Sequence, residues 1–229
     1  MLLSDRLQVI ADMVDKCDIV ADIGTDHAYI PIYLIKNGIC SKAIASDINQ
    51  GPIEKARNNL KREGLQSKIE CRIGGGLSTI KVNEVQAAII AGMGGNLITD
   101  IVEEGTDVIK TMDYCIVQPM QHSDVLRKYL FENGFEILEE DLCKDEGKYY
   151  EMMKIKWGSG PKYLEDIYYE ISPKLIEIKH PMLKEYIEYK IAKNNSIIRN
   201  IESNGMNAVE RIEALKKNNK ELEVVMKCL

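Results

Sequence analysis

The sequence of 229 residues lacks several features that would place it in other protein classes. It contains no run of 18 apolar residues, which excludes a transmembrane helix and argues against a membrane partner. None of its six cysteines forms a Cys-x-x-Cys pair and only three histidines are present, so we expect no disulfide framework and no zinc or other metal site. The early acidic residue Asp5 argues against a secretory signal. We therefore expect a cytoplasmic protein with reduced thiols.

An excess of positive charge is also missing. The chain carries 36 acidic and 30 basic side chains, a net charge of −6, which argues against a protein that coats nucleic acid nonspecifically. Residues 1–157 hold 25 acidic and 18 basic side chains, whereas residues 158–229 hold 11 and 12. The second part can therefore present a local basic face, although a solvated helix face is the simpler interpretation.

Short β-rich runs alternate with helical patterns over residues 1–157. The predicted strands cover 17–23, 42–47, 69–73, 87–91 and 114–117, and the predicted helices cover 29–37, 52–63, 96–110 and 123–133. Strands separated by helices predict βαβ units and a parallel sheet. Two further runs, 135–141 and 149–157, share only a polar turn and predict a hairpin with one strand antiparallel to the rest. This α/β pattern is typical of the methyltransferase variety of Rossmann-like sheet.

The segment Gly158-Ser159-Gly160-Pro161 predicts a boundary between a domain of residues 1–157 and a domain of residues 158–229. Beyond it, apolar residues at near-heptad spacing predict two antiparallel helices separated by Asn204-Gly205. These residues are Leu183, Ile187, Ile191, Ile198 and Ile201 on the first helix, and Val209, Ile212, Leu215, Leu222 and Val225 on the second. We expect a small, coiled-coil-like helical domain.

The segment Asp22-Ile23-Gly24-Thr25-Asp26-His27-Ala28 follows the first predicted strand and opens the first helix of the sheet. Ligands of parallel α/β sheets bind at this edge. A dinucleotide fingerprint needs two more glycines, but Asp26 and Tyr29 stand there and would oppose a pyrophosphate. S-adenosylmethionine carries an ammonium and a sulfonium, so it tolerates acidic neighbours. We expect this cofactor, with Asp22 or Asp26 meeting its ammonium directly or through water.

Two further loops extend the predicted cofactor site. Asp47 ends the second strand, 25 residues after Asp22, where a carboxylate can accept hydrogen bonds from both ribose hydroxyls. The segment Gly74-Gly75-Gly76 ends the third strand and would let an adenine lie against backbone. One glycine loop alone is more often a structural turn, but three at the ends of successive strands favour a ligand. The predicted cofactor-binding residues are Asp22, Gly24, Thr25, Asp26, Asp47, Ile48, Gly74, Gly75, Gly76 and Gly92.

Four side chains near the ends of the first, fourth and fifth strands are candidate catalytic residues: Tyr29, His27, Gln118 and Met93. Tyr29 could stack on or hydrogen-bond a target base, Gln118 could hydrogen-bond a base edge, and Met93 could form an apolar wall. Local hydrogen bonding by His27 and ordinary packing by Tyr29 and Met93 are equally compatible with the sequence.

The candidate loops lack the devices of two methyltransferase classes. No Asn/Asp-Pro-Pro-Tyr/Phe motif for exocyclic amines follows the fourth strand, and no loop cysteine is placed for attack on pyrimidine C5, since Cys71 and Cys115 fall inside predicted strands. A ring nitrogen with a free lone pair needs neither device. It needs positioning and stabilisation of a cationic product.

At these residues the chain resembles the bacterial tRNA (adenine-N1)-methyltransferases that modify adenine 22. The matching segments are Leu3-Ser4-Asp5-Arg6-Leu7, Asp22-Ile23-Gly24-Thr25-Asp26-His27-Ala28-Tyr29, Ser46-Asp47-Ile48-Asn49, Ala91-Gly92-Met93-Gly94-Gly95 and Gln118-Pro119. The resemblance implies S-adenosyl-L-methionine as methyl donor, tRNA as substrate and partner, and a helical domain that helps to hold the tRNA. Candidate tRNA contacts in that domain are Lys184, Lys190, Lys193 and Arg199.

The chain departs from this family at one loop, which usually reads Gly-Asp-Gly-Leu and here reads Gly74-Gly75-Gly76-Leu77. The resemblance places the missing carboxylate near the adenine of the cofactor, where the backbone amides of Gly75 and Gly76 could serve instead. Two alternatives stay open: a tRNA- or protein-binding module that has lost catalysis, and a methyltransferase of small molecules or proteins. We expect a monomer or a weak homodimer.

Overall fold

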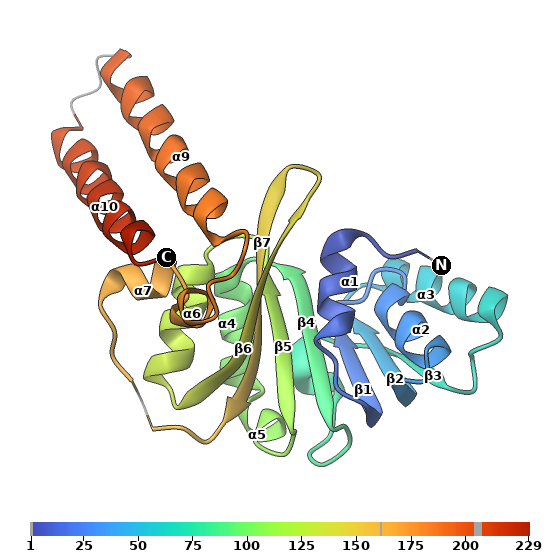
Figure 1. Ribbon diagram of the computed structural model, residues 1–229. Coiled ribbons are helices and arrows are strands. Elements are labelled where there is room, and N and C mark those ends of the chain that lie inside the picture. Colours follow the sequence, from blue (N-terminus) through green and yellow to red (C-terminus); the bar gives the residue numbers. More distant parts are fainter. Residues whose placement is uncertain (1, 161, 204–207) are drawn as a thin grey trace. The chain divides into compact units, whose positions relative to one another are not determined.

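The computed structural model describes residues 2–160, 162–203 and 208–229. The chain forms two compact units, Met1–Tyr163 and Leu164–Leu229 (Figure 1). The segment Gly158-Ser159-Gly160 therefore belongs to the first unit, and the unit boundary lies slightly later than the domain boundary expected from composition. The expected helix break at Asn204-Gly205 lies outside the described residues.

The first unit is built on a seven-stranded sheet in the order β3-β2-β1-β4-β5-β7-β6 (Figure 1). Its strands are β1 (Cys17–Ile23), β2 (Cys40–Asp47), β3 (Ile69–Ile73), β4 (Ala87–Met93), β5 (Tyr114–Pro119), β6 (Phe135–Asp145) and β7 (Lys148–Trp157). Strands β1 to β5 pair in parallel, and β7 is antiparallel to both β5 and β6. The predicted Rossmann-like sheet with one antiparallel strand in a terminal hairpin is confirmed.

Helices cover both faces of this sheet. They are α1 (Asp5–Asp12), α2 (Tyr29–Lys36), α3 (Gln50–Glu63), α4 (Gly95–Glu104), α5 (Thr106–Ile109) and α6 (Ser123–Glu132), with a short 3-10 helix η1 (Gly76–Thr79) after β3. Ile10, Leu34 and Leu60 of α1, α2 and α3 share one hydrophobic cluster with Ile89 of β4. The next residue of that strand, Ile90, packs in the opposite cluster with α4, α5 and α6. Because both faces are buried, the central strands are apolar along their whole length.

Helix α1 is an element that the sequence analysis did not predict. Ser4 caps it, because the Ser4 hydroxyl accepts a hydrogen bond from the Leu7 N–H, and Asp5 lies in its first turn, where a negative charge is favourable. The helix packs on the sheet through the buried Ile10 and Ala11. Its first turn carries Arg6 and Leu7 to the edge of the sheet where the candidate site lies.

The second unit is helical in its described residues. It contains α7 (Asp166–Glu170), α8 (Pro173–Glu177), α9 (Leu183–Ser203) and α10 (Val209–Lys227), and the last two run antiparallel to each other (Figure 1). Leu183, Ile187, Ile198 and Ile201 of α9 and Leu222 and Val225 of α10 are buried, as their spacing predicted. Val209 is 59% exposed, so the prediction that it belongs to the apolar stripe is wrong. Asn219, which the pattern of apolar residues passed over, is buried instead.

Candidate active site

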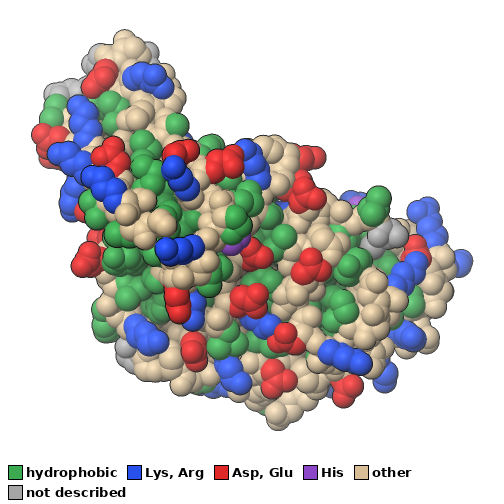
Figure 2. Space-filling view, in the orientation of Figure 1, with side chains coloured by type: hydrophobic (Ala, Val, Ile, Leu, Met, Phe, Trp, Pro, Cys, Tyr) green, Lys and Arg blue, Asp and Glu red, His purple; other side chains and the backbone are tan. Residues whose placement is uncertain are grey.

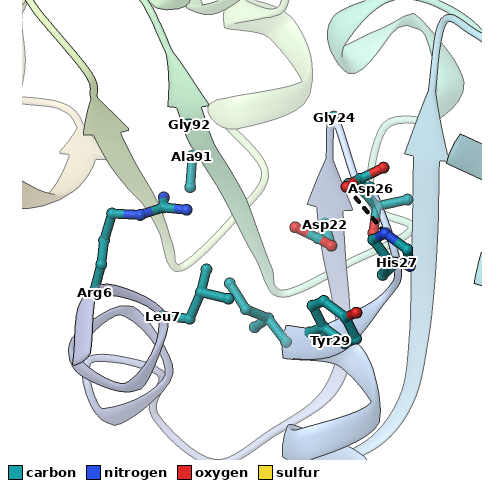
Figure 3. A pocket seen from close by; sticks show the side chains of 11 residues that line it. Arg6, Leu7, Asp22, Gly24, Asp26, His27, Tyr29, Ala91 and Gly92 are labelled. Carbon is teal, nitrogen blue, oxygen red and sulfur yellow. Dashed lines mark ion pairs between the residues drawn. The ribbon is translucent and has the colours of Figure 1, made fainter. Parts of the chain in front are cut away.

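A pocket of about 320 Å³ opens at the C-terminal ends of β1 and β4, beside α1 and α2 (Figure 3). Its lining residues are Arg6, Leu7, Asp22, Gly24, Thr25, Asp26, His27, Tyr29, Ile30, Ala91 and Gly92. Seven residues proposed from the sequence, from Asp22 to Tyr29 and at Gly92, thus meet in one cavity. Arg6 and Leu7 join them although they were not assigned to the site.

The turn at Gly24 shapes the floor of this pocket. The backbone N–H groups of Gly24 and Thr25 both donate to the carbonyl oxygen of Ser46, each at 2.8 Å. Gly24 adopts a φ of +78°, which side chains rarely tolerate, and a Cβ there would lie 2.0 Å from Met93 Cε. The backbone conformation therefore favours glycine, and any side chain at this position would also displace the end of Met93, which lies across the turn.

Asp22 is a buried carboxylate at the end of β1, with 7% of its surface exposed. Burial raises the pKa of Asp22 to about 6, against a hydrogen bond from Thr25 that lowers it, and the nearby charge of Asp47 raises it further. No cationic side chain pairs with Asp22 in the described part of the chain. A carboxylate in this state is stabilised by any cationic group that enters the pocket, such as an ammonium.

Asp26 differs from Asp22 because it already has cationic or protonatable neighbours. Its carboxylate lies 3.2 Å from Lys55 Nζ and 3.2 Å from His27 Nε2. The sequence left open which of the two aspartates meets the ammonium of a cofactor, and the contacts favour Asp22. His27 in turn stacks on Tyr29, with ring centroids 4.9 Å apart and planes at 7°, and Tyr29 is 39% exposed.

The predicted ribose and adenine residues lie outside this pocket, at the ends of β2 and β3. Asp47 Oδ1 accepts a hydrogen bond from the Asn49 N–H, and the Gly74 N–H donates to the Asp47 carbonyl oxygen. The Ile48 side chain is 68% exposed, and a Cβ on Gly75 would lie 3.5 Å from Ile48 Cδ1. Gly76 completes this edge as the first residue of η1. An exposed apolar side chain beside a bare backbone offers a flat surface to an aromatic ring.

Gln118 ends β5 and is fully buried. Its Oε1 accepts hydrogen bonds from Arg6 Nη1 at 2.6 Å and from the Gly92 N–H at 3.2 Å, and its Nε2 donates to the Pro119 carbonyl oxygen at 2.7 Å. The other N–H of Nε2 faces Met120 Sδ at 3.9 Å. Because Gln118 is fully buried, a base edge would reach this donor only if neighbouring residues moved. The hydrogen bonds of this amide join α1 to the ends of β4 and β5.

Three of the four candidate tRNA contacts in the second unit, Lys184, Lys193 and Arg199, are exposed on α9. Lys190 is different: its Nζ lies 3.3 Å from Glu170 and 4.9 Å from the centroid of the Tyr186 ring. Lys190 therefore holds α9 to α7 within this unit. Its charge is largely neutralised there, which makes it a weaker candidate than the other three.

None of the helices within residues 2–160, 162–203 and 208–229 combines the length and apolar character that crossing a membrane requires. No group of three or more His, Cys, Asp or Glu side chains within these ranges is arranged to hold a metal ion.

Comparison with known proteins matches residues 3–153 to the family model described as a methyltransferase domain. The tRNA (adenine(22)-N(1))-methyltransferase of Bacillus subtilis is 39% identical over 156 residues, which cover 68% of this chain and 66% of that protein. The crystal structure of the B. subtilis m1A22 tRNA methyltransferase TrmK superposes with a TM-score of 0.85 and 31% identity, covering 98% of this chain and 99% of that one. The structure of M. capricolum TrmK in complex with S-adenosyl-homocysteine gives a TM-score of 0.83 and 28% identity, over 98% of this chain and all of the other. With this similarity over almost its whole length, the chain belongs to the TrmK family of tRNA (adenine-22-N1)-methyltransferases.

Proposed function

We propose that this chain transfers the methyl group of S-adenosyl-L-methionine to N1 of adenine 22 in tRNA. The observation that carries the proposal is the buried carboxylate of Asp22, which forms an ion pair with no cationic side chain in the described residues. It lies beside the Gly24 turn at the sheet edge where ligands of parallel α/β sheets bind. The B. subtilis and M. capricolum relatives support the reaction and the cofactor.

In this proposal, different residues of the sheet edge bind different parts of the cofactor. Asp22 receives the ammonium of the amino-acid tail, and Gly24 and Thr25 let the backbone approach it closely. Asp47 accepts hydrogen bonds from the ribose hydroxyls. Ile48 and the backbone of Gly74, Gly75 and Gly76 lie against the adenine, in place of the carboxylate that the family usually carries at position 75.

When bound, S-adenosylmethionine supplies an electrophilic methyl group, which the lone pair of adenine N1 attacks. Neutral adenine carries no proton on N1, so the chain needs no general base before attack. Because N1 lies on the pairing edge, the target base must leave its stack to reach the pocket. The stacked rings of His27 and Tyr29 are the aromatic surface on which such a base can rest, and they can stabilise the cationic product. Met93 forms an apolar wall of the methyl path.

The second unit contributes to tRNA binding through the exposed basic side chains of α9. The proposal places the enzyme in the cytoplasm, because its substrate tRNA is found there. It also holds that the enzyme acts as a monomer or weak homodimer.

The experiment is a radiolabelled methyl-transfer assay on unmodified tRNA transcripts, followed by mass spectrometry of the nucleosides. We expect 1-methyladenosine from a transcript with adenine 22 and no incorporation into a matched transcript with guanine 22. The Asp47→Ala variant should need at least tenfold more cofactor, because hydrogen bonds to a charged group contribute about 1.5–3 kcal/mol each. Absence of methylated adenine with a bound cofactor would favour the binding module, and transfer to a protein or small molecule instead of tRNA would favour the other alternative.

A further inference from the structure

Cys17 and Cys40 begin the neighbouring strands β1 and β2 and lie directly opposite each other in their parallel pairing (Figure 1). Their Sγ atoms are 3.2 Å apart. The Cys17 N–H donates to the carbonyl oxygen of Ile39 at 3.1 Å, which holds the two strand ends together at this position. Both thiols are free, and neither has a part in the proposed methyl transfer.

The strand pairing gives these two residues the geometry of a disulfide. A disulfide joins residues whose Cα atoms are about 4.4–6.8 Å apart, and neighbouring strands are spaced about 4.7–4.9 Å apart. Directly paired residues on adjacent strands meet this requirement without any movement of the backbone. Rotation of the two side chains is enough to bring the sulfur atoms from 3.2 Å to the bonding distance of about 2.0 Å.

The other cysteines of the sheet lack such a partner. In the register of the strands they face residues other than cysteine: Ala45 opposite Cys71, Ala88 and Ile155 opposite Cys115, and Tyr150 opposite Cys143. Within the part of the chain that the structure describes, none of these three sulfur atoms contacts a second cysteine. The juxtaposition at the start of β1 and β2 is therefore not a general result of cysteines being used as small apolar residues.

Access and ionisation favour reaction at this pair. Cys17 is half-buried at the rim of the sheet, which leaves the pair open to a small oxidant, whereas Cys115 is fully buried within β5. A hydrogen bond from the Cys17 thiol lowers the pKa of Cys40, although burial opposes this effect. Since the thiolate is the reactive form of cysteine, a thiol that donates to its neighbour assists the first step of oxidation.

We propose that Cys17 and Cys40 form a site of reversible oxidation, at which a peroxide converts the two thiols into a disulfide between β1 and β2. A thiolate of the pair attacks one oxygen of hydrogen peroxide, the O–O bond breaks, and the other oxygen leaves and takes up a proton to become water. The second sulfur then attacks the resulting sulfenic acid, so that the S–S bond forms, the S–O bond breaks and a second water leaves. The two sulfur atoms lose two electrons, which reduce the peroxide, and a small dithiol restores both thiols by exchange.

The position of the pair determines what the disulfide changes. It lies at the ends of β1 and β2 opposite to those that carry Asp22 and Asp47, so the candidate active site keeps its geometry. The bond closes the chain between residues 17 and 40 and thereby constrains the unfolded state. We therefore expect the oxidised protein to be more stable toward heat and to bind S-adenosylhomocysteine as the reduced protein does.

Peptide mapping of the full chain tests the proposal. The protein is treated with hydrogen peroxide, its remaining thiols are blocked with N-ethylmaleimide, and it is digested with trypsin without reduction. Cleavage after Lys16, Lys36 and Lys42 places the two cysteines on separate peptides, 17–36 and 37–42. We expect most of peptide 17–36 to be recovered linked to peptide 37–42, with the mass of the two peptides less two hydrogen atoms, and to be released by dithiothreitol.

Thermal unfolding provides the second measurement. Peroxide should raise the unfolding temperature of wild type by about 5–10 °C, the shift expected for a disulfide in a protein of this size, and dithiothreitol should reverse it. Cys17→Ser should show no such shift. Cys228→Ser is the matched control, because it removes an exposed cysteine and keeps the pair, so it should respond as wild type does.

Recovery of both peptides unlinked, with maleimide or separate sulfinic acids on the cysteines, would overturn the proposal and leave the pair as packing residues of the core. An equal rise in the unfolding temperature of Cys17→Ser would also overturn it, since oxidation elsewhere, for example at methionine, would then be the cause. If Cys17→Ser does not fold, Cys17→Ala takes its place, and the peptide map of wild type decides without any variant. The result does not depend on the proposed methyl transfer, which none of these measurements uses.

Discussion

Asp22 is the residue whose ionisation decides whether the pocket can hold a cation. Burial disfavours its charged form, and the pKa of about 6 means that the folded protein at neutral pH keeps a carboxylate that its surroundings do not stabilise. A charge in a binding site that its surroundings do not stabilise lowers the stability of the free protein. That stability is regained when a ligand of opposite charge binds. The Asp22 carboxylate therefore both destabilises the free protein and provides the charge that binds a cation.

We predict that Asp22→Asn binds S-adenosylhomocysteine much more weakly than wild type and yet unfolds at a higher temperature at pH 7.5. The stabilisation can reach about 3 kcal/mol, because each pKa unit above the ordinary value of 3.8 corresponds to about 1.4 kcal/mol. The folded pKa is raised, so wild type loses stability as the pH rises from about 4 through about 6. The gain of the variant should shrink toward pH 4, and thermal unfolding at several pH values measures it. A variant that is less stable at pH 7.5 would contradict the raised pKa.

Part of this site could be predicted from the sequence because its residues are close together along the chain. A glycine turn and its aspartates come directly after a strand, and the C-terminal edge of a parallel sheet is where ligands bind. Arg6 could not be assigned in this way, since the contact that defines it joins residues 112 positions apart. The choice between Asp22 and Asp26 also needed the structure, because it depends on burial and on the cations Lys55 and His27.

At the scale of elements, the turn between β1 and α2 tests how closely the cofactor loop is packed. Gly24→Ala should strongly weaken binding of S-adenosylhomocysteine, because the φ of +78° is unfavourable for alanine and the end of Met93, 2.0 Å from the new Cβ, would have to move. Gly51→Ala is the matched control: Gly51 lies in α3 without a positive φ, and its Cβ would meet nothing within 4 Å. We expect the control to keep its fold and most of its affinity. Calorimetry of both variants measures the affinities. Normal binding by Gly24→Ala would show that the loop is only a structural turn and does not contact the cofactor closely.

The strands and most helices of the first unit could be predicted because their apolar patterns are strong and glycine or proline separates them. One difference concerns the helix predicted over 96–110, which is two helices, α4 and α5. Gly105 lies between them because a Cβ at this position would come within 2.4 Å of Leu77 Cδ1. Packing against a residue that is distant in sequence thus explains why glycine stands at the break, and the periodicity of the apolar residues does not contain this contact.

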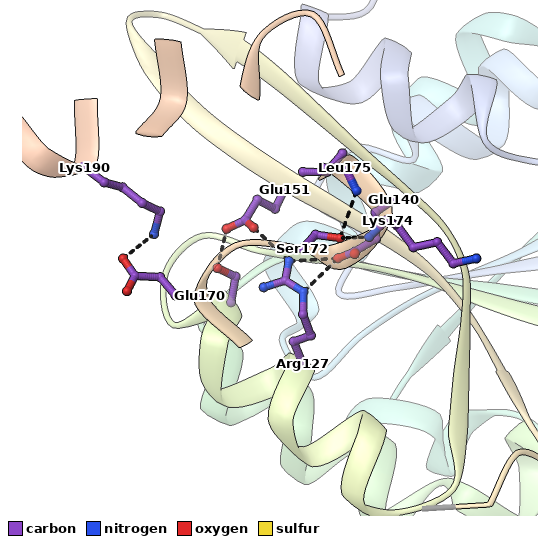
Figure 4. A network of polar contacts seen from close by, with 9 residues as sticks. Arg127, Glu140, Glu151, Glu170, Ser172, Lys174, Leu175 and Lys190 are labelled. Carbon is purple, nitrogen blue, oxygen red and sulfur yellow. Dashed lines mark hydrogen bonds and ion pairs between the residues drawn. The ribbon is translucent and has the colours of Figure 1, made fainter. Parts of the chain in front are cut away.

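Two buried polar groups also escaped the hydrophobic pattern. Arg127 of α6 is fully buried between Glu140 of β6 and Glu151 of β7, each at 2.8 Å (Figure 4). In the second unit, Asn194 Nδ2 donates to Oδ1 of Asn219 at 2.9 Å between α9 and α10. Buried polar groups of this kind lose their stabilisation when the elements shift, so they favour one register. We infer that Arg127 fixes the hairpin against α6 and that the asparagines fix the helical pair.

At the scale of the whole molecule, charge is the property that separates the two units. The acidic excess of the chain lies in residues 1–157, and residues 158–229 are nearly balanced. Figure 2 shows Lys and Arg side chains intermixed with Asp and Glu over the visible face of the helices α9 and α10. Among the acidic residues, Glu185 and Glu188 are exposed on α9 itself. Any attraction of tRNA by this unit must therefore come from individual phosphate contacts rather than from a uniform positive field.

The reversal of Lys184, Lys193 and Arg199 to Glu tests whether α9 makes such contacts. Each phosphate contact contributes affinity that is independent of base sequence and falls with salt, so we expect much weaker tRNA binding and a salt slope reduced by about one unit for each lost contact. Lys190 is left unchanged because it pairs with Glu170 within the unit. Gel shifts over a salt series measure the effect, and binding of S-adenosylhomocysteine should not change. The matched control reverses the exposed Lys216, Lys217 and Lys220 of α10, which alters the net charge equally. If both triple variants bind tRNA with the same affinity, or the α9 variant binds like wild type, the basic residues of α9 are a solvated helix face and not a tRNA contact.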